Sequence, residues 1–143
     1  MQNLEKSMIS KLIETAMEQL KFSYTPYSNF KVGASLLTKN GQIYTGCNIE
    51  NAAYTPTNCA ERTAFFKAVS EGERHFAAIC IVGGKDGKLA DYTSPCGVCR
   101  QVMMEFCEPE QFKIILAISR EEYLIYTLKE LLPEGFGPAR LAR

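Results

Sequence analysis

The 143-residue sequence contains no tryptophan, one histidine and no surplus of charge, because 16 Lys and Arg residues balance 16 Asp and Glu residues. A chain without net charge has no broad field that would attract nucleic acid or an anionic membrane surface. Long apolar runs are missing too, since the longest, Phe76 to Val82, is far shorter than the roughly 20 residues that cross a bilayer. These absences argue against nucleic-acid and membrane partners and leave a small neutral ligand open.

Features of secreted proteins are also absent. The first residues are polar instead of forming the apolar segment of a signal peptide, and no Asn-x-Ser/Thr site occurs. We therefore expect a cytoplasmic protein, in which cysteines are free thiols or metal ligands and not disulfides. The length and a composition of 46% hydrophobic and 22% charged residues predict one globular domain over residues 1–143. The six cysteines are Cys47, Cys59, Cys80, Cys96, Cys99 and Cys107.

Hydrophobic periodicity predicts helices and strands in a mixed order. An amphipathic helix spans Leu4 to Leu20, with Asn3 placed to cap its start. Asn40-Gly41 is a strong signal for a hairpin, and Thr127-x-x-Glu130 forms a capping box before a short helix. The other predicted elements are strands at 31–38, 42–48, 76–82, 114–118 and 123–126, a helix from 59 to a stop at Gly72, and a helix that begins after Pro95 and turns Val98, Val102, Met103 and Phe106 inward.

The lengths of the connections predict the topology. Only residues 120–122 link the last two strands, and a parallel pair needs a crossover of about a dozen residues, so these strands must be antiparallel if they are neighbours. The two connections that contain helices are long enough for parallel crossovers. The predicted fold is α/β, a three-layer α-β-α sandwich with a mixed five-stranded sheet.

Three cysteines stand at predicted helix starts. Cys59 opens the second helix, and Cys96 and Cys99 open the third, one turn apart on one face. Helix N-termini favour thiolates, and in an open α/β sheet helix starts gather at the carboxyl ends of strands. The three sulfurs are therefore expected to converge on one metal ion.

Three thiolates without an obvious fourth ligand are typical of a catalytic zinc site, because structural zinc sites are closed by four protein ligands. Glu61, two residues after Cys59, is placed to reach a water molecule in the open position. The lone His75 falls in a predicted turn and is read as a surface residue. The remaining cysteines are read as core or strand residues. Taken alone, the Cys-x-x-Cys pair could also be a redox pair.

The metal motifs and several other segments resemble the zinc-dependent cytidine deaminase family, in its small homotetrameric type with three cysteine ligands. The similarity extends over about residues 4–137. The segments that carry it are Cys59-Ala60-Glu61-Arg62, Pro95-Cys96-x-x-Cys99-Arg100-Gln101, Tyr27-Ser28-x-Phe30-x-Val32-Gly33-Ala34, Gly46-x-Asn48-Ile49-Glu50-Asn51-Ala52-Ala53-Tyr54 and Glu130-Leu131-Leu132-Pro133-x-x-Phe136.

The resemblance implies roles for individual residues. Asn48 and Glu50 match the pair that binds the ribose, and they are expected on one face at the end of the second strand. Phe30 matches an aromatic residue near the nucleoside, and Phe136 matches one that covers the base in a neighbouring subunit's site. Core packing remains an alternative for both phenylalanines, as do capping and solvated charge for Asn48 and Glu50. Ala60 and Tyr54 complete the expected substrate-binding set.

The implied reaction is the deamination of cytidine, and of 2′-deoxycytidine, to the uridine nucleoside and ammonia. One Zn²⁺ per subunit would lower the pKa of water to generate the hydroxide that attacks C4, and Glu61 would carry protons to the ring nitrogen N3 and to the departing amino group. Three thiolates weaken zinc as a Lewis acid. Arg62 is expected to hydrogen-bond the sulfurs and offset their charge, with Gln101 as a second donor.

Other readings remain open. A blasticidin-type or other small-molecule aminohydrolase of the same superfamily would share the three cysteines. A tRNA adenosine deaminase is disfavoured by Cys59 and by zero net charge, and a nucleotide deaminase by the carboxylate of Glu50 at the sugar. A non-catalytic zinc module that binds a partner protein would require a fourth ligand and would have no use for Glu61.

Overall fold

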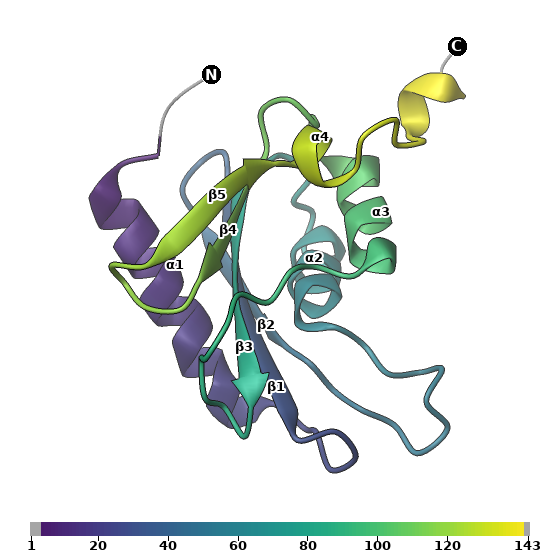
Figure 1. The fold of residues 1–143 in the computed structure, drawn as a ribbon. Coiled ribbons are helices and arrows are strands. Elements are labelled where there is room, and N and C mark those ends of the chain that lie inside the picture. The colour runs from purple at the N-terminus through teal and green to yellow at the C-terminus, as the bar shows by residue number, and fades with distance from the viewer. Residues whose placement is uncertain (1–3, 142–143) are drawn as a thin grey trace.

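The computed structural model describes residues 4–141 and has one mixed sheet at its centre. The strands follow the order β2-β1-β3-β4-β5. Helix α1 lies along one face of this sheet, and α2 and α3 lie on the other (Figure 1). The predicted α-β-α sandwich with a mixed five-stranded sheet is confirmed. The elements are α1 (Lys6–Glu18), β1 (Phe30–Thr38), β2 (Ile43–Cys47), α2 (Ala60–Ser70), β3 (Phe76–Lys85), α3 (Gly97–Phe106), β4 (Lys113–Ala117), β5 (Tyr123–Thr127) and α4 (Leu128–Leu131), with 3₁₀ turns at Gln19–Phe22 and Pro138–Arg140.

The alternation of side chains along β3 explains the three layers. Ile79 and Ile81 are buried in the cluster that includes α2 and α3, whereas Ala78 and Cys80 are buried in the cluster that includes α1. A strand with apolar residues on both faces requires cover on both sides. This is why Phe76 to Val82 is continuously apolar.

Pairing directions agree with the predicted topology. β3 and β4 are parallel and connected through α3, whereas β1 pairs antiparallel with both β2 and β3. β4 and β5 are antiparallel, as their short link requires. The capping box also forms, because Thr127 Oγ1 accepts from the Glu130 amide at 3.2 Å and Glu130 Oε1 accepts from the Thr127 amide at 2.8 Å.

The predicted hairpin forms around a type I turn with a left-handed glycine. The Gly41 amide donates to the Thr38 carbonyl at 3.1 Å, and the Thr38 amide donates to the Gln42 carbonyl at 2.9 Å. Gly41 has a φ of 94°, which a residue with a Cβ atom adopts only with strain. The Asn40-Gly41 signal therefore predicted the connection correctly.

Several local expectations need correction or fall outside the described residues. β3 continues past Gly83 and Gly84 to Lys85, because its ladder with β1 extends to the Phe30–Lys85 pair. β2 ends at Cys47, so that position 48 lies beyond the strand. Val98 is 57% exposed, which contradicts its predicted inward orientation. The predicted cap Asn3 lies outside the described residues, and the N-cap position of α1 is occupied by Glu5.

A close backbone approach fixes α2 against the sheet. A Cβ atom at Gly46 in β2 would lie 2.2 Å from the Ala60 carbonyl oxygen and 2.7 Å from the Ala64 amide nitrogen. Only glycine permits this contact, which brings the first turn of α2 directly onto β2. Among residues 4–141 no helix has both the length and the apolar character needed to cross a membrane.

Candidate active site

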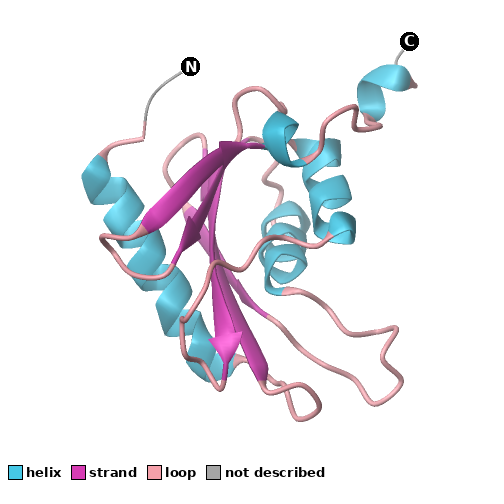
Figure 2. Cartoon of the chain, viewed as in Figure 1, coloured by secondary structure: helices cyan, strands magenta, loops and turns pink. Residues whose placement is uncertain are grey.

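The start of α2 is positioned by a bridge from the residues after β2. Ile49 and Asn58 exchange two backbone hydrogen bonds of 2.9 Å, although the loop between them extends away from the sheet (Figure 2). In this antiparallel register, position 48 lies next to position 59. Cys59 is the N-cap residue of α2, and its carbonyl accepts from the Thr63 amide at 3.0 Å. The bridge therefore brings Asn48 next to Cys59 at the helix start, whereas Glu50 lies opposite position 57.

The start of α3 is held by an arginine clamp. Cys96 is the N-cap residue, and its sulfur accepts from the Cys99 amide at 3.5 Å. Arg100 donates from Nε to the Pro95 carbonyl at 2.8 Å, from Nη2 to Ser94 Oγ at 3.0 Å, and from Nη1 to the Leu131 carbonyl. This side chain therefore fixes the backbone directly before Cys96.

The three predicted cysteines converge. Their sulfur atoms all lie within 4.8 Å of one another, with Cys59 Sγ 3.7 Å from Cys96 Sγ and Cys96 Sγ 3.5 Å from Cys99 Sγ. Cys99 is buried, Cys59 is half-buried and Cys96 is exposed, so the cluster opens to the surface at one side. Three soft ligands at such spacing suit Zn²⁺ and leave the fourth tetrahedral position for a small molecule.

Hydrogen bonds within the cluster shift the pKa values of Cys59 and Cys99 in opposite directions. A hydrogen bond from Cys99 lowers the pKa of Cys59 to about 5, with Arg62 acting in the same direction and burial opposing. The same hydrogen bond, together with burial, raises the pKa of Cys99. These directions favour ionisation of Cys59 and oppose that of Cys99, which fits a site where a divalent ion would offset the charge of the cysteine ligands.

Arg62 supplies positive charge next to the sulfurs, as predicted. Its Nη2 donates to Cys59 Sγ at 3.2 Å. Burial opposes its ionisation, but hydrogen bonds to Cys59 and Cys99 raise its pKa above the ordinary arginine value. The buried Nε has no hydrogen-bond partner among the described residues. A fixed guanidinium at this place reduces the negative charge that three thiolates would put on a metal.

Glu61 is buried beside the cluster. Only 4% of its surface is exposed, in the first turn of α2. Burial raises its pKa to about 7, and the negative charge of Cys59 acts in the same direction. At neutral pH, a carboxyl group with a pKa near 7 is present in both its protonated and its ionised form, which suits a general acid–base catalyst.

Asn48 and Glu50 lie where the first strand begins, and both already hold backbone groups. Asn48 Nδ2 donates to the Phe30 carbonyl at 2.8 Å, and its Oδ1 accepts from the Val32 amide at 3.0 Å. Glu50 Oε1 accepts from the amides of Tyr27 at 3.0 Å and Ser28 at 3.2 Å. A hydrogen bond from the Ser28 hydroxyl is the main cause that lowers the pKa of Glu50, which is therefore a carboxylate at neutral pH.

The other expected substrate-binding residues, Ala60, Tyr54 and Phe30, lie in different parts of the fold. Ala60 is fully buried in the first turn of α2, and Tyr54 contacts Tyr27 edge to face at 6.1 Å between ring centres. Phe30 is 39% exposed at the start of β1. A hollow of about 390 Å³ is lined by Tyr27, Ser28, Glu50, Asn51, Tyr54 and Thr57, whereas Phe30 lines a different hollow together with Gly83 and Tyr92.

Phe136 is presented outward, in the segment after α4. Its side chain is 57% exposed, and Gln101 Nε2 donates to its carbonyl oxygen at 2.7 Å. Gln101 thus holds this segment with the amide that was expected to reach a ligand sulfur. Neither periodicity nor spacing indicates this contact, because its acceptor is a backbone atom 35 positions away.

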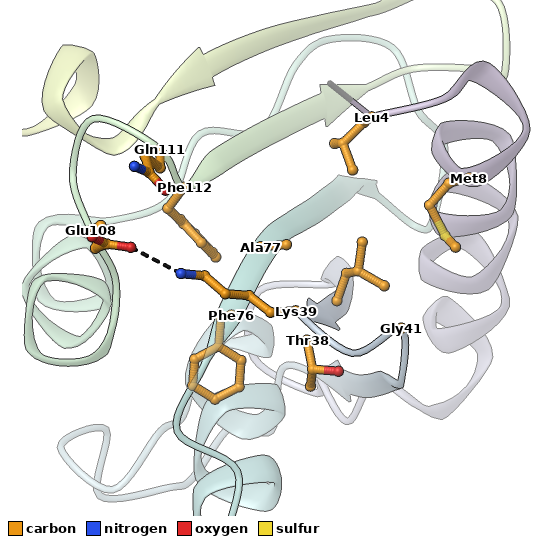
Figure 3. A pocket seen from close by; sticks show the side chains of 11 residues that line it. Leu4, Met8, Thr38, Lys39, Gly41, Phe76, Ala77, Glu108, Gln111 and Phe112 are labelled. Carbon is orange, nitrogen blue, oxygen red and sulfur yellow. Dashed lines mark hydrogen bonds and ion pairs between the residues drawn. The ribbon is translucent and has the colours of Figure 1, made fainter. Parts of the chain in front are cut away.

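A separate cavity of about 410 Å³ lies between the start of α1 and the loop before β4 (Figure 3). Lys39 Nζ and Glu108 Oε1 form an ion pair 2.9 Å long at this cavity. None of the predicted site residues lines it. His75 is exposed, and Cys47, Cys80 and Cys107 are buried or half-buried away from the three-sulfur cluster, as expected.

Sequence reasoning missed two residues that organise the site. Ser28 lies within the quoted Tyr-Ser-x-Phe segment, and Arg100 directly follows a cysteine ligand candidate, but neither position had been assigned a role.

A buried carboxyl group lies beside three clustered thiols that open to the surface, on a mixed α/β sheet. This combination defines a metal-dependent hydrolytic enzyme.

Comparison with known proteins shows which family of metal-dependent hydrolases this chain belongs to. The family model described as the cytidine and deoxycytidylate deaminase zinc-binding region matches residues 6–115, and the chain belongs to this family. It is 46% identical to a cytidine deaminase of Sporosarcina psychrophila, over 94% of this chain and 95% of that protein. A probable cytidine deaminase of Dictyostelium discoideum is 42% identical, over 94% of this chain and 87% of the relative.

Solved structures agree. A crystal structure of cytidine deaminase from Burkholderia pseudomallei matches with a TM-score of 0.80 and 44% identity, covering 88% of this chain and 97% of that one. That of cytidine deaminase from Mycobacterium tuberculosis matches with a TM-score of 0.77 and 34% identity, covering 94% and 99%. The resemblance inferred from the motifs is confirmed, and zinc is the metal that suits the cysteine cluster.

Proposed function

We propose that this protein hydrolyses the exocyclic amino group of cytidine and 2′-deoxycytidine, giving the uridine nucleoside and ammonia. One observation carries the proposal: three cysteine sulfurs within 4.8 Å of one another open to the surface beside a carboxyl group that is 4% exposed. Family membership and relatives named cytidine deaminase support the substrate. We propose Cys59, Cys96 and Cys99 as the ligands of one Zn²⁺ per subunit.

Glu61 moves the protons in the proposed mechanism. Its carboxylate takes a proton from the attacking water and delivers it to N3 of the cytosine ring, which makes C4 electrophilic. A C4–O bond forms, and Glu61 then takes the second proton from this oxygen and passes it to the amino nitrogen, so that the C4–N bond breaks, ammonia leaves and a C4 carbonyl remains. The burial of Glu61 in the first turn of α2 supports this role, because its carboxyl group is shielded from solvent beside the cysteine cluster.

Arg62 and Ala60 determine the charge and the free space around the cysteine ligands. Zinc, when bound, supplies Lewis acidity and lowers the pKa of water. Arg62 donates to Cys59 Sγ and limits the negative charge of the ligand set. Ala60, fully buried between the first ligand and Glu61, leaves the helix start free of a large side chain.

We assign recognition of the sugar to Asn48 and Glu50. Each retains hydrogen-bonding capacity beyond its backbone partners, because an amide nitrogen has two donors and a carboxylate has about four acceptor positions. The negative charge of Glu50 also opposes a substrate phosphate. Free cytosine lacks the hydroxyls that these groups would bind, and we expect it to be a poor substrate.

Replacing Glu50 with glutamine is expected to lower kcat/KM for cytidine about 10- to 100-fold, because a charge-assisted hydrogen bond becomes a neutral one. Discrimination against cytidine 5′-monophosphate should relax in the same variant, since the repulsive charge is gone. Rates for cytidine, cytosine and the monophosphate in wild type, Glu50→Gln and the exposed control Glu121→Gln measure both effects. Unchanged ratios in Glu50→Gln would remove Glu50 from the sugar site.

The assembly we propose is a homotetramer in which Phe136 reaches a neighbouring subunit's site. The 57% exposure of this phenylalanine, on a segment that Gln101 fixes, supports that arrangement. Phe136→Ala should then raise KM for cytidine several-fold. Light scattering gives the mass, and a monomer with full activity would contradict the arrangement.

Residues 1–143 are proposed to act as one domain, since one sheet joins both core clusters. A reducing, cytoplasmic location suits six cysteines without a disulfide among the described residues. The direct test of function is an ultraviolet assay of cytidine conversion alongside metal analysis. Stoichiometric zinc without any turnover of cytidine or deoxycytidine would refute the proposed activity.

A further inference from the structure

The turn before β1 is joined to Glu50 by three hydrogen bonds. Glu50 Oε1 accepts from the amides of Tyr27 and Ser28, and Oε2 accepts from the Ser28 hydroxyl. The same hydroxyl accepts from the Phe30 amide at 3.0 Å. Ser28 Oγ therefore lies between the carboxylate assigned to the sugar and the backbone that carries the aromatic Phe30.

These contacts fix which acceptor positions of Glu50 remain free. A carboxylate has about four acceptor positions, two on each oxygen. Both positions on Oε1 are taken by amides, and one on Oε2 is taken by Ser28. A single position on Oε2 remains, beside the hollow of about 390 Å³ that Glu50 and Ser28 line together.

Two backbone hydrogen bonds hold the turn in addition to the one that Ser28 Oγ accepts from the Phe30 amide. The Asn29 amide donates to the Thr25 carbonyl at 3.0 Å, and the Asp86 amide donates to the Asn29 carbonyl at 2.7 Å. Asn29 has a φ of 57°, a conformation that asparagine tolerates. Removing the hydroxyl should thus free Oε2 and the Phe30 amide, while these two bonds keep the amides of Tyr27 and Ser28 in place.

We propose that Ser28 is a positioning residue for sugar recognition, whose hydroxyl holds the Glu50 carboxylate so that one acceptor of Oε2 faces a substrate hydroxyl. The inference rests on the proposed function and deepens it. Ser28 touches no reacting atom and acts through Glu50. Its contribution should consequently appear in KM for substrates with sugar hydroxyls and leave the chemical step nearly unchanged.

The test compares Ser28→Ala with Ser28→Thr, which retains a hydroxyl, on cytidine and on 2′,3′-dideoxycytidine, which has neither hydroxyl of the sugar ring. Ser28→Ala should raise KM for cytidine about tenfold, as expected for a misplaced charge-assisted hydrogen bond, with kcat within about threefold. KM for dideoxycytidine should not change. Ser28→Thr should restore most of the affinity for cytidine. Ser70→Ala, which removes an exposed hydroxyl bonded to Lys67 at the end of α2, is the matched control.

A second arm asks whether the effect passes through Glu50. In the Glu50→Gln background, Ser28→Ala should have no further effect on KM for cytidine. Equal rises in KM for cytidine and dideoxycytidine, or an undiminished effect in that background, would overturn the proposal. If Ser28→Ala does not fold, Ser28→Cys, a much weaker donor, is compared in the same way, and equal KM shifts for both nucleosides would again overturn it. If the zinc-loaded wild-type protein does not convert cytidine at all, the proposed function itself is refuted.

Discussion

The Glu61→Gln variant is expected to retain the fold and bound zinc, and its kcat should be lower than that of the wild type by a factor of about 10² to 10⁴. The exchange keeps the volume of the side chain but removes the group that carries protons to N3 and to the departing amine. Glu61 is buried, and an uncharged amide is easier to bury than a carboxylate, so stability should not fall.

Steady-state kinetics, zinc analysis and thermal melting together test this expectation. The matched control is Glu71→Gln, which alters a glutamate at the C-terminal end of the same helix. More than about a hundredth of the wild-type rate in Glu61→Gln, with zinc bound, would contradict the assigned role.

Alanine in place of Cys99 is expected to abolish stoichiometric zinc and, with it, turnover. Cys99 is buried and its sulfur lies 3.5 Å from that of Cys96, so two thiols and an empty third position remain after the change. Loss of one of three ligands leaves too few donors for tight binding at a tetrahedral metal.

Metal content is measured after dialysis by elemental analysis, with Cys47→Ala as a control for the loss of a half-buried thiol outside the cluster. Cys96→Ser separates metal binding from helix capping, since serine still accepts a hydrogen bond at an N-cap. Full zinc occupancy with normal activity in Cys99→Ala would show that the metal lies elsewhere.

The sequence was most informative where local chemistry decides the structure. The capping box at Thr127 and Glu130 needs only residues within one turn, and it formed as predicted. The short link before β5 permits only an antiparallel neighbour, whatever the rest of the chain does. The cysteine cluster was also predictable, because helix starts and strand ends meet at one edge of such a sheet.

The errors and omissions concern partners that are distant in sequence. Val98 follows a helical apolar pattern, yet its side chain is 57% exposed. Gln101 bonds to a backbone carbonyl in the segment that follows α4. The Ser28–Glu50 contact spans 22 positions and depends on the rotamers of two side chains. Periodicity and spacing contain no information about such contacts.

The positions of Cys59 and Cys96 also bear on how the chain stays folded. They are 37 positions apart and cap two different helices, which follow different strands. An ion bound to both sulfurs closes this loop as a disulfide would. For a covalent closure of that length, the chain-entropy model gives a gain in folding stability of roughly 4 kcal/mol at 25 °C. The metal then cross-links two parts of the chain in addition to its part in catalysis. Its removal should accelerate amide hydrogen exchange at the starts of α2 and α3 before it affects the strands of the sheet.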